Sequence, residues 1–345
     1  MIESKCPNCK MIYLLTNDNM KGQVGVCNRC KSRFNIPDPI VWEPLGQNDP
    51  VFALPKVDIN SNNPGCMIFL IDQSGSMEKQ FPVNKKGDKA VRKDAVAEII
   101  NKLLYNLTLR CTQGQEIKNR FHIAIYGYGG TRDGKDKVEN VLKEDGLKPV
   151  SWIAENVPEV VSRKIVQKND QGQPVEIMIP YPIWLKPHAE GMTPMYAAFK
   201  RAFDLISEWI KRYPKSYPPI IFNITDGVYT DGNPKEIVQK IAKLGTSVGK
   251  TMVMNCHISD DAMDPLIFPN NDAMRNLNGP QRLLYEISSV LPQNMIEQAQ
   301  MKGFKLSQGA RGFAFNADMS TLVDFLSIGG TLPGGSVVLT CEDLR

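Results

Sequence analysis

Several features that define common classes of protein are missing from this sequence. Its first residues, 1–6, lack the apolar core of a secretory signal peptide, and no uncharged apolar run approaches the roughly 18 residues of a membrane-spanning helix. The 41 basic and 37 acidic side chains nearly balance, which by itself does not indicate a nucleic-acid-binding protein. These absences predict a soluble, cytoplasmic protein with no membrane partner.

Signatures of catalysis are missing as well. The sequence has no Walker motif and no G-x-G-x-x-G pattern, and the stretch 127–130 (Gly-Tyr-Gly-Gly) is predicted to be a turn. No Ser/His/Asp or Cys/His set has a supporting motif. His122 and His257 fall inside apolar runs, where a hydrogen-bonded core histidine is expected. The chain is therefore predicted not to be an enzyme.

Four of the eight cysteines have the spacing of a metal site. Cys6 and Cys9 form one C-x₂-C pair, Cys27 and Cys30 form a second, and 17 residues separate the pairs. This spacing is typical of a structural site in which four thiolates bind Zn²⁺ tetrahedrally, with a redox dithiol pair or disulfides as the alternatives. The remaining cysteines are scattered singly and are predicted to be buried or idle thiols; they are Cys66, Cys111, Cys256 and Cys341.

Residues 1–35 are predicted to form a Cys₄ zinc ribbon. A module of this size cannot bury a sufficient core, so metal binding would supply its folding energy. Lys10 and Lys31 follow the two cysteine pairs at positions where many ribbons have glycine. The module carries a weak positive charge once the Zn(Cys)₄ centre is counted, which favours a protein partner over nucleic acid and leaves both open.

The rest of the chain alternates strand-like and helical patterns. Residues 36–64 carry six prolines and are predicted to be a linker. Apolar runs at 66–71, 121–126, 220–224, 252–258 and 312–315 predict strands buried on both faces. Three- and four-residue periodicity predicts helices over 91–107 and 195–213, the N-cap sequence at 233–236 predicts a helix as far as 244, and a further helix is predicted over 282–290. This order predicts an α/β domain over 65–330, with a doubly wound, mainly parallel sheet, an insertion at 130–187 and a tail at 331–345.

Oxygen-bearing side chains lie at the ends of three of the predicted elements. They are Asp72, Ser74 and Ser76 after the first strand, Thr193 before a helix, and Asp226 after a later strand. Ligands of open parallel sheets bind beyond the carboxyl ends of the strands, so these segments can converge at one edge. An all-oxygen set is what a hard, octahedral cation such as Mg²⁺ prefers. His188 and the stretch 259–261 (Ser-Asp-Asp) are close enough in sequence to reach the rim of this site, but neither is expected to belong to it.

The D-x-S-x-S, T and D pattern resembles the metal-ion-dependent adhesion site of von Willebrand factor A (vWA) domains. The resemblance covers about residues 65–330, with departures at 78–86 and 130–187. It implies that Ser74, Ser76 and Thr193 supply hydroxyl ligands to Mg²⁺, or to Mn²⁺ or Ca²⁺. It also implies that Asp72 and Asp226 bind the metal directly or through water, and that a carboxylate of a protein partner takes the open coordination position.

Among vWA proteins, the chain looks most like the bacterial tellurite-resistance (TerY-type) group. The supporting stretches are 69–77, 191–195 and 223–227. This resemblance implies a non-enzymatic scaffold in stress-response or phage-defence signalling, beside a protein kinase or a metal-dependent phosphatase. Two alternatives stay open, namely a vWA subunit of an AAA-type ATPase and a nucleic-acid sensor that uses the zinc ribbon.

Overall fold

The structure of this chain is a computed structural model. It describes residues 2–8, 12–15, 23–28, 30–35, 54, 57–82, 88–132, 135–168, 173–259, 263–277 and 279–329. Cys9, Cys341, most of the predicted linker and the predicted tail therefore lie outside the described residues. The division of the chain into domains stays a prediction.

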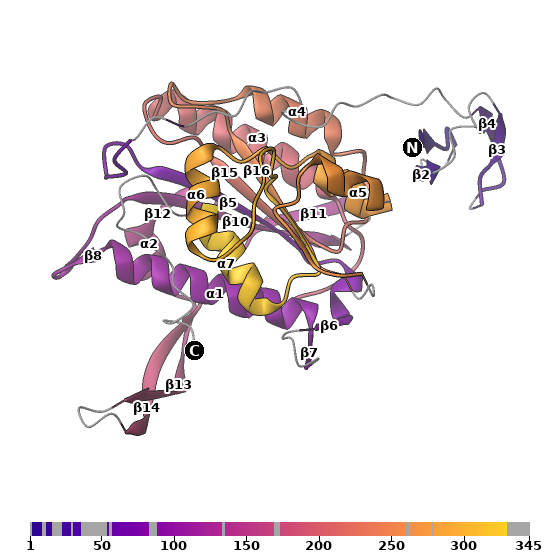
Figure 1. Cartoon of the computed structure of the whole chain (residues 1–345). Coiled ribbons are helices and arrows are strands. Elements are labelled where there is room, and N and C mark those ends of the chain that lie inside the picture. The colour runs from indigo at the N-terminus through magenta and orange to yellow at the C-terminus, as the bar shows by residue number, and fades with distance from the viewer. Residues whose placement is uncertain are drawn as a thin grey trace.

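An eight-stranded, mostly parallel sheet forms the centre of the molecule (Figure 1). Its parallel strands are β10 (Phe121–Arg132), β5 (Gly65–Asp72), β15 (Ile220–Thr225), β16 (Met252–His257) and β18 (Phe313–Phe315), in that spatial order. Antiparallel strands lie at the two edges; they are β11 (Lys135–Asn140) and β12 (Lys148–Pro149), both paired with β10, and β17 (Leu266–Ile267), paired with β18.

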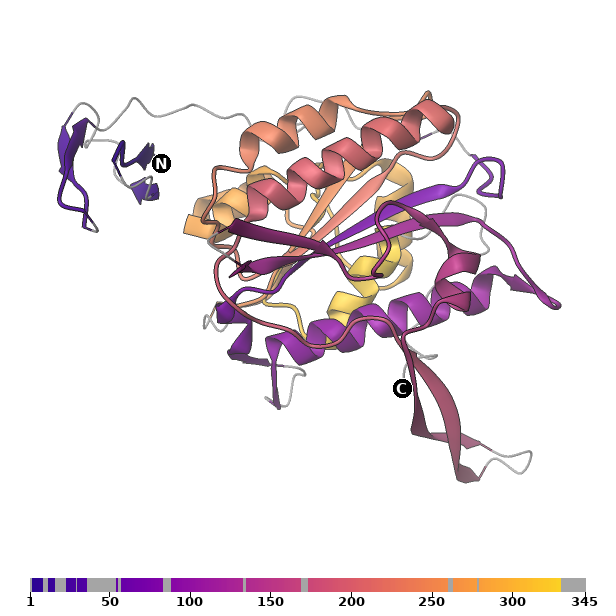
Figure 2. The ribbon, with the colours of Figure 1, turned by 180° about the vertical axis from the view of Figure 1, so that it is seen from behind.

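Helices cover both faces of this sheet (Figures 1 and 2). One face carries α1 (Arg92–Cys111), α2 (Val150–Glu155), α6 (Gln293–Met301) and α7 (Met319–Gly329). The other face carries α3 (Met195–Arg212), α4 (Lys235–Lys243) and α5 (Gly279–Glu286). Every residue of β5, β15 and β16 is buried, because alternate side chains of each strand enter one helical layer or the other.

The remaining elements are short or lie outside the central sheet. Near the site these are η2 (Gly75–Glu78), β6 (Gln80–Pro82) and β7 (Lys89–Val91); elsewhere they are β8 (Thr112–Gln113), β9 (Glu116–Ile117) and η3 (Asn271–Asn276). Two small antiparallel ribbons lie near the N-terminus; they are formed by β1 (Ile2–Lys5) with β2 (Ile12–Leu15), and by β3 (Val24–Val26) with β4 (Arg33–Asn35).

Most of the predicted elements are confirmed, and one was wrong. The helices predicted over 91–107, 195–213 and 233–244 correspond to α1, α3 and α4, and the five predicted strands are β5, β10, β15, β16 and β18. The Gly-rich stretch 127–130 is not a turn, because it continues strand β10 as far as Arg132. The helix predicted over 282–290 begins at Gly279 and ends at Glu286.

A long hairpin projects from the helical layer (Figures 1 and 2). It consists of β13 (Glu159–Lys168) and β14 (Pro174–Ile183), and lies within the segment predicted as an insertion. Its base is attached to α1 by a bidentate ion pair, in which Arg163 donates to both carboxylate oxygens of Glu98 at 2.6 and 2.8 Å. The ring of Tyr181 also packs edge-on against Tyr105 of α1.

The chain returns from this hairpin to Thr193 through a segment that α1 holds in place. The buried Asn101 side chain accepts hydrogen bonds from the backbone N–H groups of Trp184 and Leu185 at 2.8 and 2.9 Å. Its amide nitrogen donates to the Leu185 carbonyl at 2.8 Å. One buried side chain thus satisfies three backbone groups of a segment that forms no sheet there.

We therefore expect Asn101→Ala to lower the free energy of unfolding by about 3 kcal/mol, because it leaves buried backbone groups without partners. Urea unfolding followed by tryptophan fluorescence measures this change. Leu109→Ala is the matched control, since Leu109 lies on the same helix and is exposed. An equal loss in both variants would contradict this role of Asn101.

Candidate functional site

The strand order places a crevice between β5 and β15. Numbered along the chain, the five parallel strands lie in the order 2-1-3-4-5 of a doubly wound fold, with the reversal between β5 and β15. After β5 the chain continues to α1, which packs on one face of the sheet, and after β15 it continues to α4, which packs on the opposite face. Ligands bind at such a switch point, beyond the carboxyl ends of the strands. Asp72 is the last residue of β5, and Asp226 directly follows β15.

Asp72 connects the loops that follow these two strands. Its side chain is buried, and its Oδ1 accepts a hydrogen bond from the Ser74 backbone N–H at 2.8 Å. Its Oδ2 accepts one from the Thr225 hydroxyl at 2.6 Å. The Thr225 oxygen in turn accepts a bond from the Gly227 N–H at 2.9 Å. The carboxylate therefore orients both the loop that carries the serines and the loop that carries Asp226.

The three hydroxyl residues are brought to the same place. The hydroxyls of Ser74 and Ser76 lie 2.9 Å apart. The Thr193 loop is fixed to the serine loop by a hydrogen bond from the Gly75 N–H to the Gly191 carbonyl at 3.1 Å. On its other side, the Thr193 N–H donates to the Thr230 hydroxyl at 3.0 Å. Bonds to backbone groups thus position the Thr193 loop beside the serine loop.

Asp226 has one paired and one unsatisfied carboxylate oxygen. Its Oδ2 forms an ion pair with Nη1 of Arg92 at 3.2 Å. Its Oδ1 is buried and has no hydrogen-bond partner among the residues that the structure describes. The backbone carbonyl of Asp226 accepts a bond from Nε2 of His257 at 2.7 Å. A buried carboxylate oxygen without a donor is costly in free energy, and a cation would satisfy it.

A pocket of about 510 Å³ opens onto these groups. Four of the five predicted ligands line it, and they are Ser74, Ser76, Thr193 and Asp226. Asp72 does not line the pocket, which agrees with an orienting role for this residue. The rim also contains the cationic side chains of Lys79 and Arg92, together with Ser259.

The electrostatics of the site favour a cation. Burial, and then the nearby Asp226 carboxylate, raise the pKa of Asp72 to about 6, although the hydrogen bonds from Ser74 and Thr225 act in the opposite direction. Two carboxylates close together in a buried setting are stabilised by a positive charge. Carboxylate and hydroxyl oxygens fit Mg²⁺, so the residues present suit the predicted metal. Its binding stays a prediction.

Close packing around the site depends on two glycines. A Cβ on Gly129 of β10 would lie 2.3 Å from the Gln73 carbonyl oxygen, and one on Gly227 would lie 2.7 Å from Nε2 of His257. Gly227 also has a φ of +95°, in the left-handed region that favours glycine. The glycine-rich run 127–130 was therefore a signal of close backbone approach at this site, rather than of a turn.

The two histidines near the site differ in their relation to the pocket. His188 is not among the residues that line the pocket; it is half-exposed, with Nε2 3.8 Å from Glu190. His257 is buried as predicted, but it also lines the pocket and bonds to Asp226. Ser259 lines the pocket, whereas Asp260 and Asp261 lie outside the described residues.

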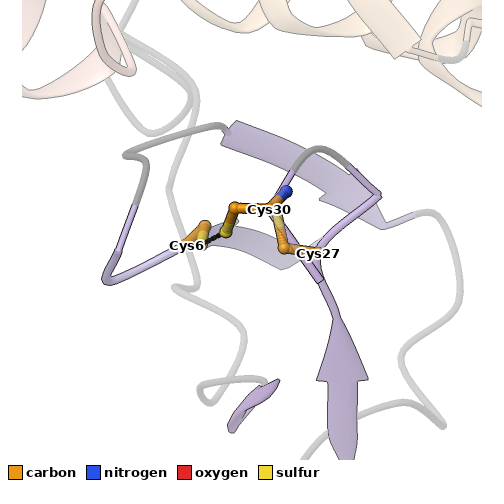
Figure 3. A group of neighbouring side chains, drawn as sticks. All are labelled: Cys6, Cys27 and Cys30. Atoms are coloured by element: carbon orange, nitrogen blue, oxygen red, sulfur yellow. Dashed lines mark hydrogen bonds between the residues drawn. The ribbon is translucent and has the colours of Figure 1, made fainter. Parts of the chain in front are cut away.

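A separate cluster of sulfur atoms lies in the N-terminal segment (Figure 3). The Sγ atoms of Cys6, Cys27 and Cys30 all lie within 4.8 Å of one another, and could hold a metal such as zinc. The fourth predicted ligand, Cys9, lies outside the described residues. The Cys27 carbonyl accepts a bond from the Lys31 N–H at 2.8 Å, in a tight turn where Lys31 has a φ of +59°. Lysine thus takes the glycine-like conformation at the position where many ribbons have glycine.

The other described cysteines are isolated from one another. Cys66, Cys111 and Cys256 are buried in the domain core. Burial raises the pKa of the Cys111 thiol to about 11 and also raises the pKa values of the Cys66 and Cys256 thiols. Because the thiolate is the reactive form, these side chains are inert core residues, as predicted.

Comparisons with known proteins show only distant similarity. No family model and no curated protein matches this chain. Similar solved structures include the vWF domain of the type V pili tip protein Mfa5 from Porphyromonas gingivalis, at 11% identity and a TM-score of 0.28 over 49% of this chain. The PilB minor pilin from Streptococcus sanguinis is similar at 14% identity and a TM-score of 0.28 over 66% of this chain. The human COPII-coat protein Sec24c is similar at 12% identity and a TM-score of 0.28 over 88% of this chain.

The chain spans less than half the length of each of these structures: 39% of Mfa5, 42% of PilB and 42% of Sec24c. At such identities and TM-scores the likeness carries no argument about function. Within the described parts of the chain, no helix combines the length and the apolar character needed to span a bilayer.

The raised pKa of Asp72 predicts a pH dependence of stability in protein that is free of divalent cations. Between about pH 4 and pH 6 the unfolded chain releases the Asp72 proton before the folded protein does, so the free energy of unfolding falls as the pH rises. Asp72→Asn should abolish this fall, which amounts to about 3 kcal/mol. Urea unfolding at several pH values measures it.

Asp94→Asn is the control for this experiment, since Asp94 is exposed in the first turn of α1. Parallel pH profiles for the wild-type protein and the Asp72→Asn variant would contradict the raised pKa of Asp72.

The cysteine cluster predicts one equivalent of tightly bound zinc. We expect Cys27→Ser to reduce zinc in the purified protein by at least about tenfold, because the metal loses one of its thiolates. Metal analysis by mass spectrometry measures the content. Cys111→Ala, which changes a buried cysteine outside the cluster, should leave it unchanged. Equal zinc in the two variants would exclude the cluster as the zinc site.

Proposed function

We propose that this chain is a vWA-type protein that binds protein partners through a Mg²⁺ ion and is not itself an enzyme. The observation that carries the proposal is the pocket at the switch point, which is lined by Ser74, Ser76, Thr193 and Asp226. These four side chains come from three segments far apart in the sequence. Asp72 holds two of the segments in place through buried hydrogen bonds.

The side chains of the pocket suit ligation better than nucleophilic catalysis. A serine nucleophile needs a base that can take its proton. The ring nitrogen Nε2 of His257 lies 2.7 Å from the Asp226 carbonyl, and since a carbonyl only accepts hydrogen bonds, this nitrogen carries the proton. It is therefore occupied as a donor and cannot act as a base toward Ser74 or Ser76.

The proposed metal would supply an electrophilic centre with an exchangeable coordination position. The hydroxyls of Ser74, Ser76 and Thr193 would hold the metal, and Asp226 would contribute a carboxylate directly or through water. Lys79 and Arg92 line the same pocket, and their positive charge suits an acidic group of a partner. We infer that the ligand of the pocket is an aspartate or glutamate side chain, or a C-terminal carboxylate, of another protein.

The cellular setting rests on the resemblance to the tellurite-resistance group of vWA proteins. We propose a cytoplasmic scaffold in bacterial stress-response or phage-defence signalling, with a protein kinase or a metal-dependent phosphatase as the partner. The cysteine cluster would then form a zinc ribbon that provides a second docking surface for proteins.

The proposal predicts that partner capture requires both the metal and its hydroxyl ligands. We expect a pull-down from native cell extract to retain at least one protein in Mg²⁺ and to lose it in chelator and with Thr193→Ala. The reason is that loss of a ligand oxygen weakens the metal site without disturbing the core. Quantitative mass spectrometry of the retained proteins measures the result. Thr112→Ala is the control, because this threonine is exposed and lies on the short strand β8, outside the pocket.

Identical sets of retained proteins in all samples would contradict metal-dependent binding. Hydrolytic activity of the pure protein, removed by changing one residue outside the pocket, would contradict a non-enzymatic role.

A further inference from the structure

A buried arginine lies at the proposed metal pocket. The side chain of Arg92 is 2% exposed, and its Nη1 atom lies 3.2 Å from Oδ2 of Asp226 and 3.5 Å from the Ser76 carbonyl oxygen. Arg92 therefore contacts one predicted carboxylate ligand and the backbone of one predicted hydroxyl ligand. It also lines the same pocket as both of them.

The position of Arg92 is unfavourable for a positive charge unless an anion is close. Arg92 is the first residue of α1, and the positive end of a helix dipole repels a cation. Burial adds a desolvation cost, which an arginine can offset only through hydrogen bonds to charged or polar oxygens. The Asp226 carboxylate supplies this compensation. Arg92 and Asp226, 134 residues apart in sequence, thus stabilise each other across the crevice.

A metal ion and Arg92 would compete for the same carboxylate. Asp226 offers two oxygens; Oδ2 is engaged by Arg92, whereas Oδ1 is buried and has no hydrogen-bond partner among the described residues. A divalent cation close to Oδ1 would also lie close to the guanidinium, and the two positive charges would repel each other in a poorly solvated pocket.

We propose that Arg92 is an internal counter-ion that occupies Asp226 when no metal is bound and lowers the affinity of the pocket for Mg²⁺. This inference rests on the proposed function, because it concerns the regulation of the same site. Arg92 stabilises the metal-free protein by balancing Asp226 and the neighbouring Asp72. The metal must overcome this ion pair, so the site fills only where the supply of Mg²⁺ or the partner's carboxylate favours it.

The test is isothermal titration of Mg²⁺ into wild-type protein and into Arg92→Met, both dialysed free of divalent cations. Methionine keeps an apolar stem without the charge. We expect Mg²⁺ to bind about tenfold more tightly to the variant, because the metal no longer has to break one charge-assisted hydrogen bond, and the free energy of such a bond corresponds to about this factor in affinity. We also expect a lower melting temperature of the metal-free variant, and a larger rise in that temperature on addition of Mg²⁺.

A second variant and a control distinguish the effect of the Arg92 guanidinium from misfolding and from a general change in charge. Arg92→Lys keeps a cation but loses the planar fork of donors, and should tighten binding by a smaller factor, about threefold. Lys305→Met removes an exposed charge outside the pocket and should leave the affinity unchanged. Circular dichroism establishes that each variant is folded.

The outcomes separate this inference from the proposed function. Unchanged or weaker Mg²⁺ binding by both Arg92 variants, beside clear binding by the wild-type protein, would overturn the role of Arg92 and leave the metal site intact. No Mg²⁺ binding by any of these proteins would overturn both proposals. Tighter binding by Arg92→Met would support both.

Discussion

The arrangement of the site depends on one buried carboxylate. Asp72 ends β5 and accepts hydrogen bonds from the Ser74 backbone N–H and from the Thr225 hydroxyl, which belongs to the last residue of β15. These bonds join the ends of two neighbouring parallel strands at the point where the doubly wound sheet reverses its order. The rest of the pocket is built outward from this connection.

The same carboxylate creates an electrostatic problem that the protein must solve. Asp72 is buried and lies close enough to Asp226 for the two charges to repel each other, and both effects raise its pKa. Hydrogen bonds offset only part of this cost. In the metal-free protein Arg92 offsets more of it through its ion pair with Asp226, and the proposed Mg²⁺ would take over this role when bound. A metal site and an internal ion pair are thus two answers to one requirement, namely a positive charge beside two buried carboxylates.

The sequence predicted the sheet and the convergence of the oxygen-bearing side chains because both follow from local patterns. Runs such as 66–71 and 220–224 are apolar throughout, as strands buried on both faces must be, and the ligand segments stand directly after them. Contacts across the fold could not be predicted in this way. Arg92 reads as an ordinary first residue of a helix, and only the folded chain brings it to Asp226. Gly129 looked like part of a turn because a glycine-rich run is compatible both with a turn and with close backbone approach, and only the folded chain shows Gln73 against it.

The central claim is that a divalent cation binds among Ser74, Ser76, Thr193 and Asp226. The most direct measurement is a crystal structure of the protein grown with Mn²⁺, with diffraction data collected at the manganese absorption edge. Our account predicts one anomalous peak in the pocket, coordinated by the three hydroxyl oxygens and near the Asp226 carboxylate. A pocket that shows no anomalous peak at saturating Mn²⁺, with the ion pair between Arg92 and Asp226 intact, would contradict it.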